Sequence, residues 1–270
     1  MRIPITMCHG VNPNRQPPLD AEHLEGYFRI ASDLGFTSIS YDDLVSWRNG
    51  EETLPDRPIM FDFDHPSKSI RHVIQPLMGR YGYKGNLFVN TGWMEELYSA
   101  AIPNFESRKC MIWEELQELM AAGWHIGAHT HTHPNLSDLG SQDPSGALIR
   151  EELEKNDKIL EEHLGIIPTD FAFTGTTWSR VAENEVKKRY RFGRLWIIGT
   201  HYEADGGQVR YAEIVGVPGP DEDDGGPPFA ARYITEETHD YRLPSMEFEH
   251  LTFEHDAFER YPKGALGEHS

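Results

Sequence analysis

The densest group of potential metal ligands in the sequence is segment 129–134, which reads His-Thr-His-Thr-His-Pro. If this segment turns as a helix, His129 and His133 share one face and His131 points away, whereas in an extended segment all three can point the same way. Two neutral imidazoles four residues apart can each offer a nitrogen to a divalent ion such as Zn²⁺. The alternative is a polar loop whose histidines cap the next helix.

Two carboxylates lie in a second group, segment 61–66, which reads Phe-Asp-Phe-Asp-His-Pro. In a strand, alternation places Asp62 and Asp64 on the same face. Burying them in such an apolar strand is costly unless they are paired, hydrogen-bonded or bound to a metal. One carboxylate could therefore ligate a metal while the other takes a proton from water. The alternative for either residue alone is a structural carboxylate that caps a neighbouring loop.

Both groups follow predicted strands in a chain that alternates strands with helices. Such alternation predicts a parallel sheet or a (β/α) barrel, with its chemistry at the carboxyl ends of the strands. From about residue 170 the pattern contains more strand, and an acidic Pro/Gly loop covers 216–228. We predict helices at 20–34, 43–47, 72–81 (kinked at Pro76), 113–122 and 147–164, and strands at 36–40, 59–64, 86–89, 124–128, 195–199, 209–215 and 243–248.

Composition excludes several classes of protein. The 270 residues carry a formal net charge of −19, which disfavours binding to nucleic acids and to anionic membranes. No segment has 18 consecutive apolar residues, so we predict no membrane span. With no secretory signal at the N-terminus, we expect a cytoplasmic protein, although a mature secreted form would look the same. Cys8 and Cys110 are expected to be reduced, buried thiols, with a single disulfide as the alternative.

Three stretches of the sequence resemble motifs of a known family. They are Met-Cys-His-Gly-Val at 7–11, the run 54–93 around Asp64, and His-Thr-His-Thr-His-Pro-Asn-Leu at 129–136. Together they resemble the polysaccharide deacetylases of the NodB-homology type, carbohydrate esterase family 4, specifically over residues 1–136 and weakly afterwards. The resemblance implies an α/β fold, a distorted (β/α)7-type barrel, and a single catalytic domain over residues 1–270.

The resemblance also implies a metal site. In this family one carboxylate is the catalytic base, and the metal is held by a second acidic residue and two histidines, which correspond to His129 and His133. Aligned without a gap, the chain has Asp64 as the base and His65 as the third ligand. With the Asp-x-Asp pattern of some relatives, Asp62 is the base and Asp64 the ligand. The implied cofactor is a divalent metal, most simply Zn²⁺.

The later motifs of the family match less well. Segment 171–178 stands where the third motif belongs, and there the backbone N–H of Gly175 could line an oxyanion hole. The arginine that orients the base in the family is absent. For the general acid, His201 is our candidate, with His239 as an alternative. The resemblance and the sugar-stacking capacity of tryptophan assign four residues to substrate binding: His9, Trp93, Thr174 and Trp178.

The predicted function is a metal-dependent hydrolase that removes N-acetyl groups from an amino sugar or glycan. Two alternatives remain open: a hydrolase of cyclic imides or other small amides on the same fold, and an inactive relative that binds carbohydrate. The expected partner is a glycan or amino-sugar substrate, with no nucleic acid and no membrane, and the sequence leaves the oligomeric state open.

Overall fold

Seven parallel strands close into a barrel in this computed structural model, which describes residues 1–94 and 110–268. Each strand pairs in parallel with the next, and β1 and β3 pair to close the ring. The (β/α)7 barrel expected from the sequence is therefore confirmed. In spatial order the strands are β1 (Ile3–Cys8), β3 (Pro58–Asp64), β4 (Asn86–Val89), β5 (His125–Ala128), β6 (Asp170–Ala172), β8 (Phe192–Ile197) and β12 (Leu243–Glu247).

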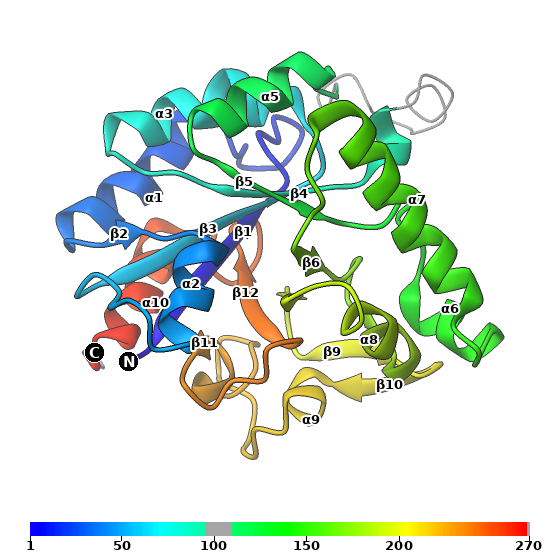
Figure 1. Cartoon of the computed structure of the whole chain (residues 1–270). Coiled ribbons are helices and arrows are strands. Elements are labelled where there is room, and N and C mark those ends of the chain that lie inside the picture. The colour runs from blue at the N-terminus through cyan, green and yellow to red at the C-terminus, as the bar shows by residue number, and fades with distance from the viewer. Residues whose placement is uncertain (95–109, 269–270) are drawn as a thin grey trace.

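Helices surround the barrel and cover its outer face (Figure 1). Several have the termini that the sequence predicts: Asp20 caps the first helix by accepting from the His23 N–H, and Gly165 ends α7 in the left-handed conformation. Pro76 lies in the first turn of α3, after a π-helical turn. The helices are α1 (Ala21–Asp33), α2 (Tyr41–Arg48), η1 (Ile70–Ile74), α3 (Gln75–Arg80), η2 (Thr91–Met94), α5 (Trp113–Ala121), α6 (Leu136–Gln142), α7 (Ala147–Leu164), α8 (Arg180–Val186), α9 (Tyr211–Val215), η4 (Phe229–Ala231) and α10 (His255–Ala265).

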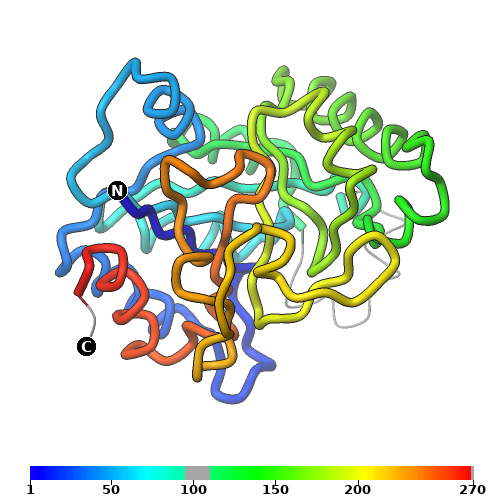
Figure 2. The backbone as a smooth tube through the Cα atoms, turned by 90° about the horizontal axis from the view of Figure 1, so that it is seen from below, coloured from blue at the N-terminus to red at the C-terminus, as the bar shows by residue number. Residues whose placement is uncertain are grey.

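Short strands extend the barrel and form a second sheet. Strand β2 (Thr37–Ser38) lies beside β3, and β11 (Tyr233–Ile234) runs antiparallel to β1. The strands β7 (Thr177–Trp178), β9 (His201–Ala204) and β10 (Gly207–Arg210) form the small second sheet. The N-terminus and the helix α10 near the end of the chain lie on the same side of the molecule (Figures 1 and 2).

The predicted strand at 209–215 is wrong beyond Arg210. Residues Tyr211–Val215 form the short helix α9, which buries Tyr211 and Ile214 three residues apart on one face. Gly216 ends this helix in the left-handed conformation. A short run of apolar residues fits a strand or a buried helical turn equally well by its pattern, and here packing selects the helix.

The barrel interior changes from apolar to charged toward the carboxyl ends of β3 and β8. On β3 the inward positions are Met60, Asp62 and Asp64, and on β8 they are Phe192, Arg194 and Trp196. Met60 and Phe192 belong to the apolar layer, and the charged side chains lie beyond it toward the carboxyl ends of the strands. The barrel therefore presents its ionisable groups at the end where βα-loops form active sites.

Two other sequence predictions concern the cysteines and the membrane. Cys8 and Cys110 are not joined by a disulfide; Cys8 is buried, as expected, but Cys110 is only half-buried. Across residues 1–94 and 110–268, no helix is both long and apolar enough to cross a bilayer.

Candidate metal-dependent active site

Three histidines from two loops converge at the carboxyl end of the barrel. His65 follows β3, and His129 and His133 follow β5. Each offers one ring nitrogen, and these nitrogens lie within 4.8 Å of one another. The three rings face a cavity of about 320 Å³, whose described lining residues are His9, Asp64, His65, Trp93, His129, His133, Gly175, Trp196, Glu247, Glu249 and His250. The two sequence-distant groups of candidate ligands therefore share one site.

The 129–133 segment is neither helical nor extended. Thr130 and His133 have left-handed φ angles of 63° and 62°, which turn the chain so that the rings of His129 and His133 lie 4.9 Å apart. His131 turns away, and its Nδ1 lies 2.9 Å from the Thr91 hydroxyl. Left-handed backbone is unfavourable for residues other than glycine, and such strain gathers at functional sites. Only two of the three histidines in this segment contribute to the cluster.

Hydrogen bonds orient two of the rings. Nδ1 of His65 donates to Asn90 Oδ1 at 2.9 Å, and Nδ1 of His129 donates to the Ala172 carbonyl at 2.8 Å. With the proton on Nδ1, Nε2 of each ring carries the lone pair. Trp93 stacks on His65 with ring centroids 4.0 Å apart and planes 12° apart. These contacts fix the tautomer and the ring plane, as partners of metal-ligating histidines do.

The cluster favours neutral imidazoles. Burial lowers the pKa of His133 to about 4. Burial, with the nearby His133, also holds the pKa values of His65 and His129 well below their ordinary value. All three rings are therefore unprotonated at neutral pH, which is the form that binds a metal.

Asp64 lies beside the histidines, and Arg194 contacts the carboxylate oxygen that faces away from His129. Its Oδ1 accepts from Arg194 Nη2, and its Oδ2 lies 3.8 Å from His129 Nε2. Asp62 lies one layer deeper, where its carboxylate accepts from the Tyr41 hydroxyl at 2.7 Å and from Asn86 at 2.9 Å. Asp64 lines the cavity, and Asp62 is absent from its described lining.

Arg194 corrects one expectation from the sequence. The arginine that orients the base is missing from segment 171–178, but Arg194 on the neighbouring strand β8 reaches Asp64 and lies 3.3 Å from Asp62 through its Nε. Arg194 is fully buried, and although burial alone would lower its pKa, the two carboxylates raise it. Sequence reasoning missed this residue because the predicted strand began at residue 195, whereas β8 begins at Phe192.

Several predicted site residues lie outside the cavity as the described residues define it. Trp178 is on β7, where its Nε1 donates to Glu183 at 3.0 Å. Thr174 is buried and donates to the Pro134 carbonyl at 2.5 Å. His201 and His239 are exposed, His201 on the small second sheet. The prediction that His201 is the general acid and that Thr174 and Trp178 bind substrate therefore disagrees with this geometry, whereas His9, Trp93 and Gly175 do line the cavity.

The histidine cluster fits a divalent metal. Nε2 of His129 is buried and has no hydrogen-bond partner in the described structure, although a buried nitrogen normally has one. Three imidazole nitrogens with an adjacent open cavity are the ligand set of a catalytic zinc site, which keeps one position for water or substrate. The residues that would hold such an ion are His65, His129 and His133.

Comparisons with known proteins identify the family and the fold. The sequence profile described as "Polysaccharide deacetylase" matches residues 51–190. No curated protein matches the chain. The solved structures it is similar to include the Streptococcus pyogenes deacetylase PplD in complex with acetate (14% identity, 92% of each chain covered, TM-score 0.62). They also include the deacetylase domain of BpsB from Bordetella bronchiseptica (15% identity, 91% of this chain and 95% of that chain, TM-score 0.64).

A polysaccharide deacetylase from Bacillus cereus is also similar in structure, with 16% identity, 97% of this chain and 69% of that chain covered, and a TM-score of 0.65. At such identities the structural likeness shows the fold, and the profile match over half of the chain shows the family. The chain belongs to the polysaccharide deacetylase family. It is accordingly a hydrolase of the class that acts on non-peptide carbon–nitrogen bonds.

Proposed function

We propose that this protein is a metal-dependent N-deacetylase of an amino sugar or a glycan that contains one. The observation that carries the proposal is the convergence of His65, His129 and His133 within 4.8 Å of one another, beside the carboxylate of Asp64. The family membership supports the reaction class, and the ligand set supports Zn²⁺ as the metal.

The proposed roles follow from the ligand nitrogens and the carboxylate. When bound by the three imidazoles, a divalent cation supplies Lewis acidity toward the acetamide carbonyl and lowers the pKa of a water molecule. Asp64 is the general base, because its Oδ2 faces the histidine cluster while Arg194 occupies Oδ1. Asp62 is excluded from this role, because the Tyr41 hydroxyl and the Asn86 amide already occupy its carboxylate.

Asp64 transfers a proton from the attacking water to the leaving nitrogen. Its Oδ2 accepts the proton of the attacking water as the new C–O bond forms. The same proton can then pass to the nitrogen as the C–N bond breaks, which releases the free amine and acetic acid, whose remaining proton is lost to water to give acetate, and restores the Asp64 carboxylate. Arg194 keeps the carboxylate oriented throughout, because it spans both Asp64 and Asp62 from the opposite strand.

Two further lining residues have proposed roles toward the substrate. Gly175 has a left-handed φ of 58° and borders the cavity, so its backbone N–H can face the carbonyl oxygen of the substrate acetamide. Trp93 covers one face of His65 at the cavity and offers an aromatic edge to a sugar ring.

An assay of acetate release tests the proposal. Zinc-loaded protein is incubated with N-acetylglucosamine oligomers, with their monosaccharide, and with small cyclic imides. Metal-dependent acetate release from the amino sugars, abolished in His133→Asn, is the expected result. Turnover of imides alone would indicate the small-amide hydrolase, and sugar binding without turnover would indicate an inactive relative; either result refutes the proposal.

A further inference from the structure

A second group of possible ligands lies on the wall of the same cavity. His9 follows β1, Glu247 ends β12 and Glu249 follows it. One ligand atom of each residue lies within 4.8 Å of the others. The ring of His9 stacks on that of His65 with centroids 5.1 Å apart, so this second group borders the three-histidine cluster.

Glu247 is a buried carboxylate with one oxygen that lacks a hydrogen-bond partner in the described structure. Its side chain is 1% exposed. Its Oε2 accepts from Trp196 Nε1 at 2.5 Å and lies 3.5 Å from His9 Nδ1. Its Oε1 is buried and has no hydrogen-bond partner in the described structure. An ionised carboxylate in such surroundings is costly unless a positive charge compensates it.

Glu249 adds a second carboxylate to this wall. Its Oε2 accepts from the Asn12 amide at 2.6 Å, and the nearby Arg15 donates to its backbone carbonyl rather than to its carboxylate. Among the described residues neither Glu247 nor Glu249 forms an ion pair with a lysine or an arginine. Two carboxylates therefore border the cavity without a permanent cationic partner.

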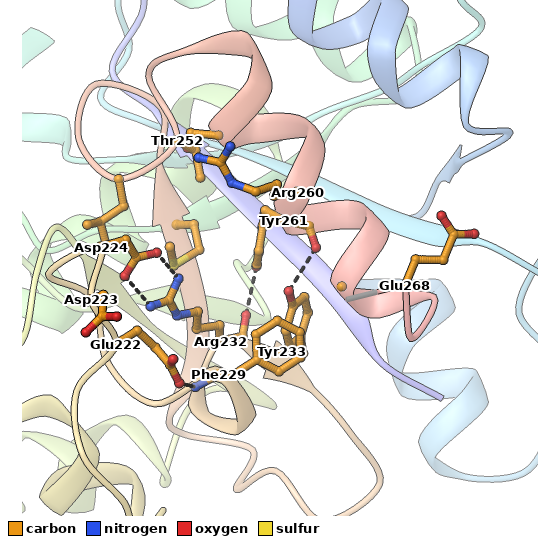
Figure 3. A pocket seen from close by; sticks show the side chains of 14 residues that line it. Glu222, Asp223, Asp224, Phe229, Arg232, Tyr233, Thr252, Arg260, Tyr261 and Glu268 are labelled. Carbon is orange, nitrogen blue, oxygen red and sulfur yellow. Dashed lines mark hydrogen bonds and ion pairs between the residues drawn. The ribbon is translucent and has the colours of Figure 1, made fainter. Parts of the chain in front are cut away.

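The acidic loop elsewhere in the chain shows the opposite arrangement. In a cavity beside α10, Asp224 receives two hydrogen bonds of 2.6 Å from Arg232, and Glu222 accepts from the Phe229 N–H at 2.8 Å (Figure 3). A guanidinium of this chain therefore compensates the charge of Asp224. The acids beside His9 are distinguished by the lack of such a partner, and not by their number.

We propose that His9, Glu247 and Glu249 bind a second divalent cation next to the three-histidine cluster. One imidazole and two carboxylates form a mixed nitrogen and oxygen set, which suits Zn²⁺ or Mn²⁺. This inference rests on the geometry of the wall and not on the proposed reaction. The second site has one imidazole where the first has three, so we expect it to bind Zn²⁺ more weakly.

Zinc titration of the whole chain tests the inference. Metal-free protein is titrated with ZnCl₂ by calorimetry, and bound zinc is counted after gel filtration. We expect two equivalents of different affinity for the wild type. Glu247→Gln and Glu249→Gln should each bind only the tighter equivalent, and His129→Asn should retain the weaker one.

The controls separate this inference from the proposed function. Glu237→Gln, an exposed carboxylate elsewhere, should still bind two equivalents. Because Glu249 is only half-buried, its variant tests the site even if Glu247→Gln fails to fold. One equivalent in the wild type, unchanged in Glu247→Gln and Glu249→Gln, would overturn the inference. Absence of acetate release would refute the deacetylase proposal and leave the second equivalent as expected.

Discussion

Arg194 on β8 crosses the barrel interior to hold Asp64 on β3, and it lies 3.3 Å from Asp62 on the same strand. All three side chains are almost fully buried. One guanidinium therefore pairs with two carboxylates that point into the barrel, and it orients the one that borders the cavity. This relationship links the stability of the barrel to the orientation of the proposed base.

Removing Arg194 should destabilise the protein strongly. Arg194→Met leaves two buried carboxylates without their partner, which typically costs about 3–5 kcal/mol of unfolding free energy. Urea unfolding measures this loss. Adding Asp62→Asn to the variant should recover part of it, since one uncompensated charge is then removed; a double variant no more stable than Arg194→Met would contradict the role of the pair.

The two aspartates should differ in their effect on turnover. Asp64→Asn removes the proposed general base and should lower kcat by about 10²–10⁴-fold with zinc still bound. Asp62→Asn should lower kcat less, because Asp62 lies outside the described cavity lining and acts through Arg194. Acetate release and zinc content are measured on both. If Asp62→Asn is the more damaging change at equal zinc content, the assignment of the base is wrong.

The third ligand position should accept a carboxylate. His65→Asp keeps one ligand atom and should retain one tightly bound zinc. His65→Ala removes the ligand itself and should weaken zinc binding by at least about 10–100-fold, the loss that is typical when only a hydrogen-bond partner of a ligand is removed. Competition with a chromophoric chelator gives both affinities. Equal zinc affinity in His65→Ala and the wild type would remove His65 from the ligand set.

The metal-free protein should lose stability as the pH falls from about 6.5 to 4. Burial lowers the pKa of His133 to about 4, and also lowers those of His65 and His129, so the unfolded chain binds more protons than the folded one in this range. The contribution of these histidines to the unfolding free energy is complete above pH 6.5, the ordinary histidine pKa, and is lost as the pH falls toward 4.

Asp62 makes the opposite contribution to the pH dependence of the unfolding free energy. Burial raises its pKa to about 6, so between about 4 and 6 the folded chain binds its proton more readily, and this contribution falls as the pH rises. Burial also raises the pKa of Asp157 to about 6, but three histidines outweigh these two carboxyls, so the net free energy of unfolding should rise with pH. Urea unfolding in EDTA at several pH values measures it, and a flat or falling profile would contradict the buried neutral cluster.

The sequence predicted much of the fold because its signals were local. Asp20 and Gly165 mark the ends of two helices, and the strand containing Asp64 has the apolar neighbours of a buried strand. His129 and His133 were identifiable from their spacing. The strained turn that separates them from His131 could not be predicted, because neither a helix nor a strand contains residues with left-handed φ angles such as Thr130 and His133.

Long-range contacts account for the part of the site that was missed. Arg194 lies 130 residues from Asp64, and nothing in its neighbourhood marks it as the partner of that carboxylate. Glu247 ends a strand near the C-terminus, in the region where the family resemblance is weak. Only its residue type indicates His201 as a general acid, and the second sheet places it at the surface.

The most direct test of the account is the zinc affinity of matched histidine variants. His133→Asn should lose the tightly bound zinc, whereas His131→Asn, changed in the same turn but facing Thr91, should bind it as the wild type does. Chelator competition on folded, metal-free proteins gives both values. Equal loss in the two variants, or tight zinc binding in both, would contradict a metal centre built from His65, His129 and His133.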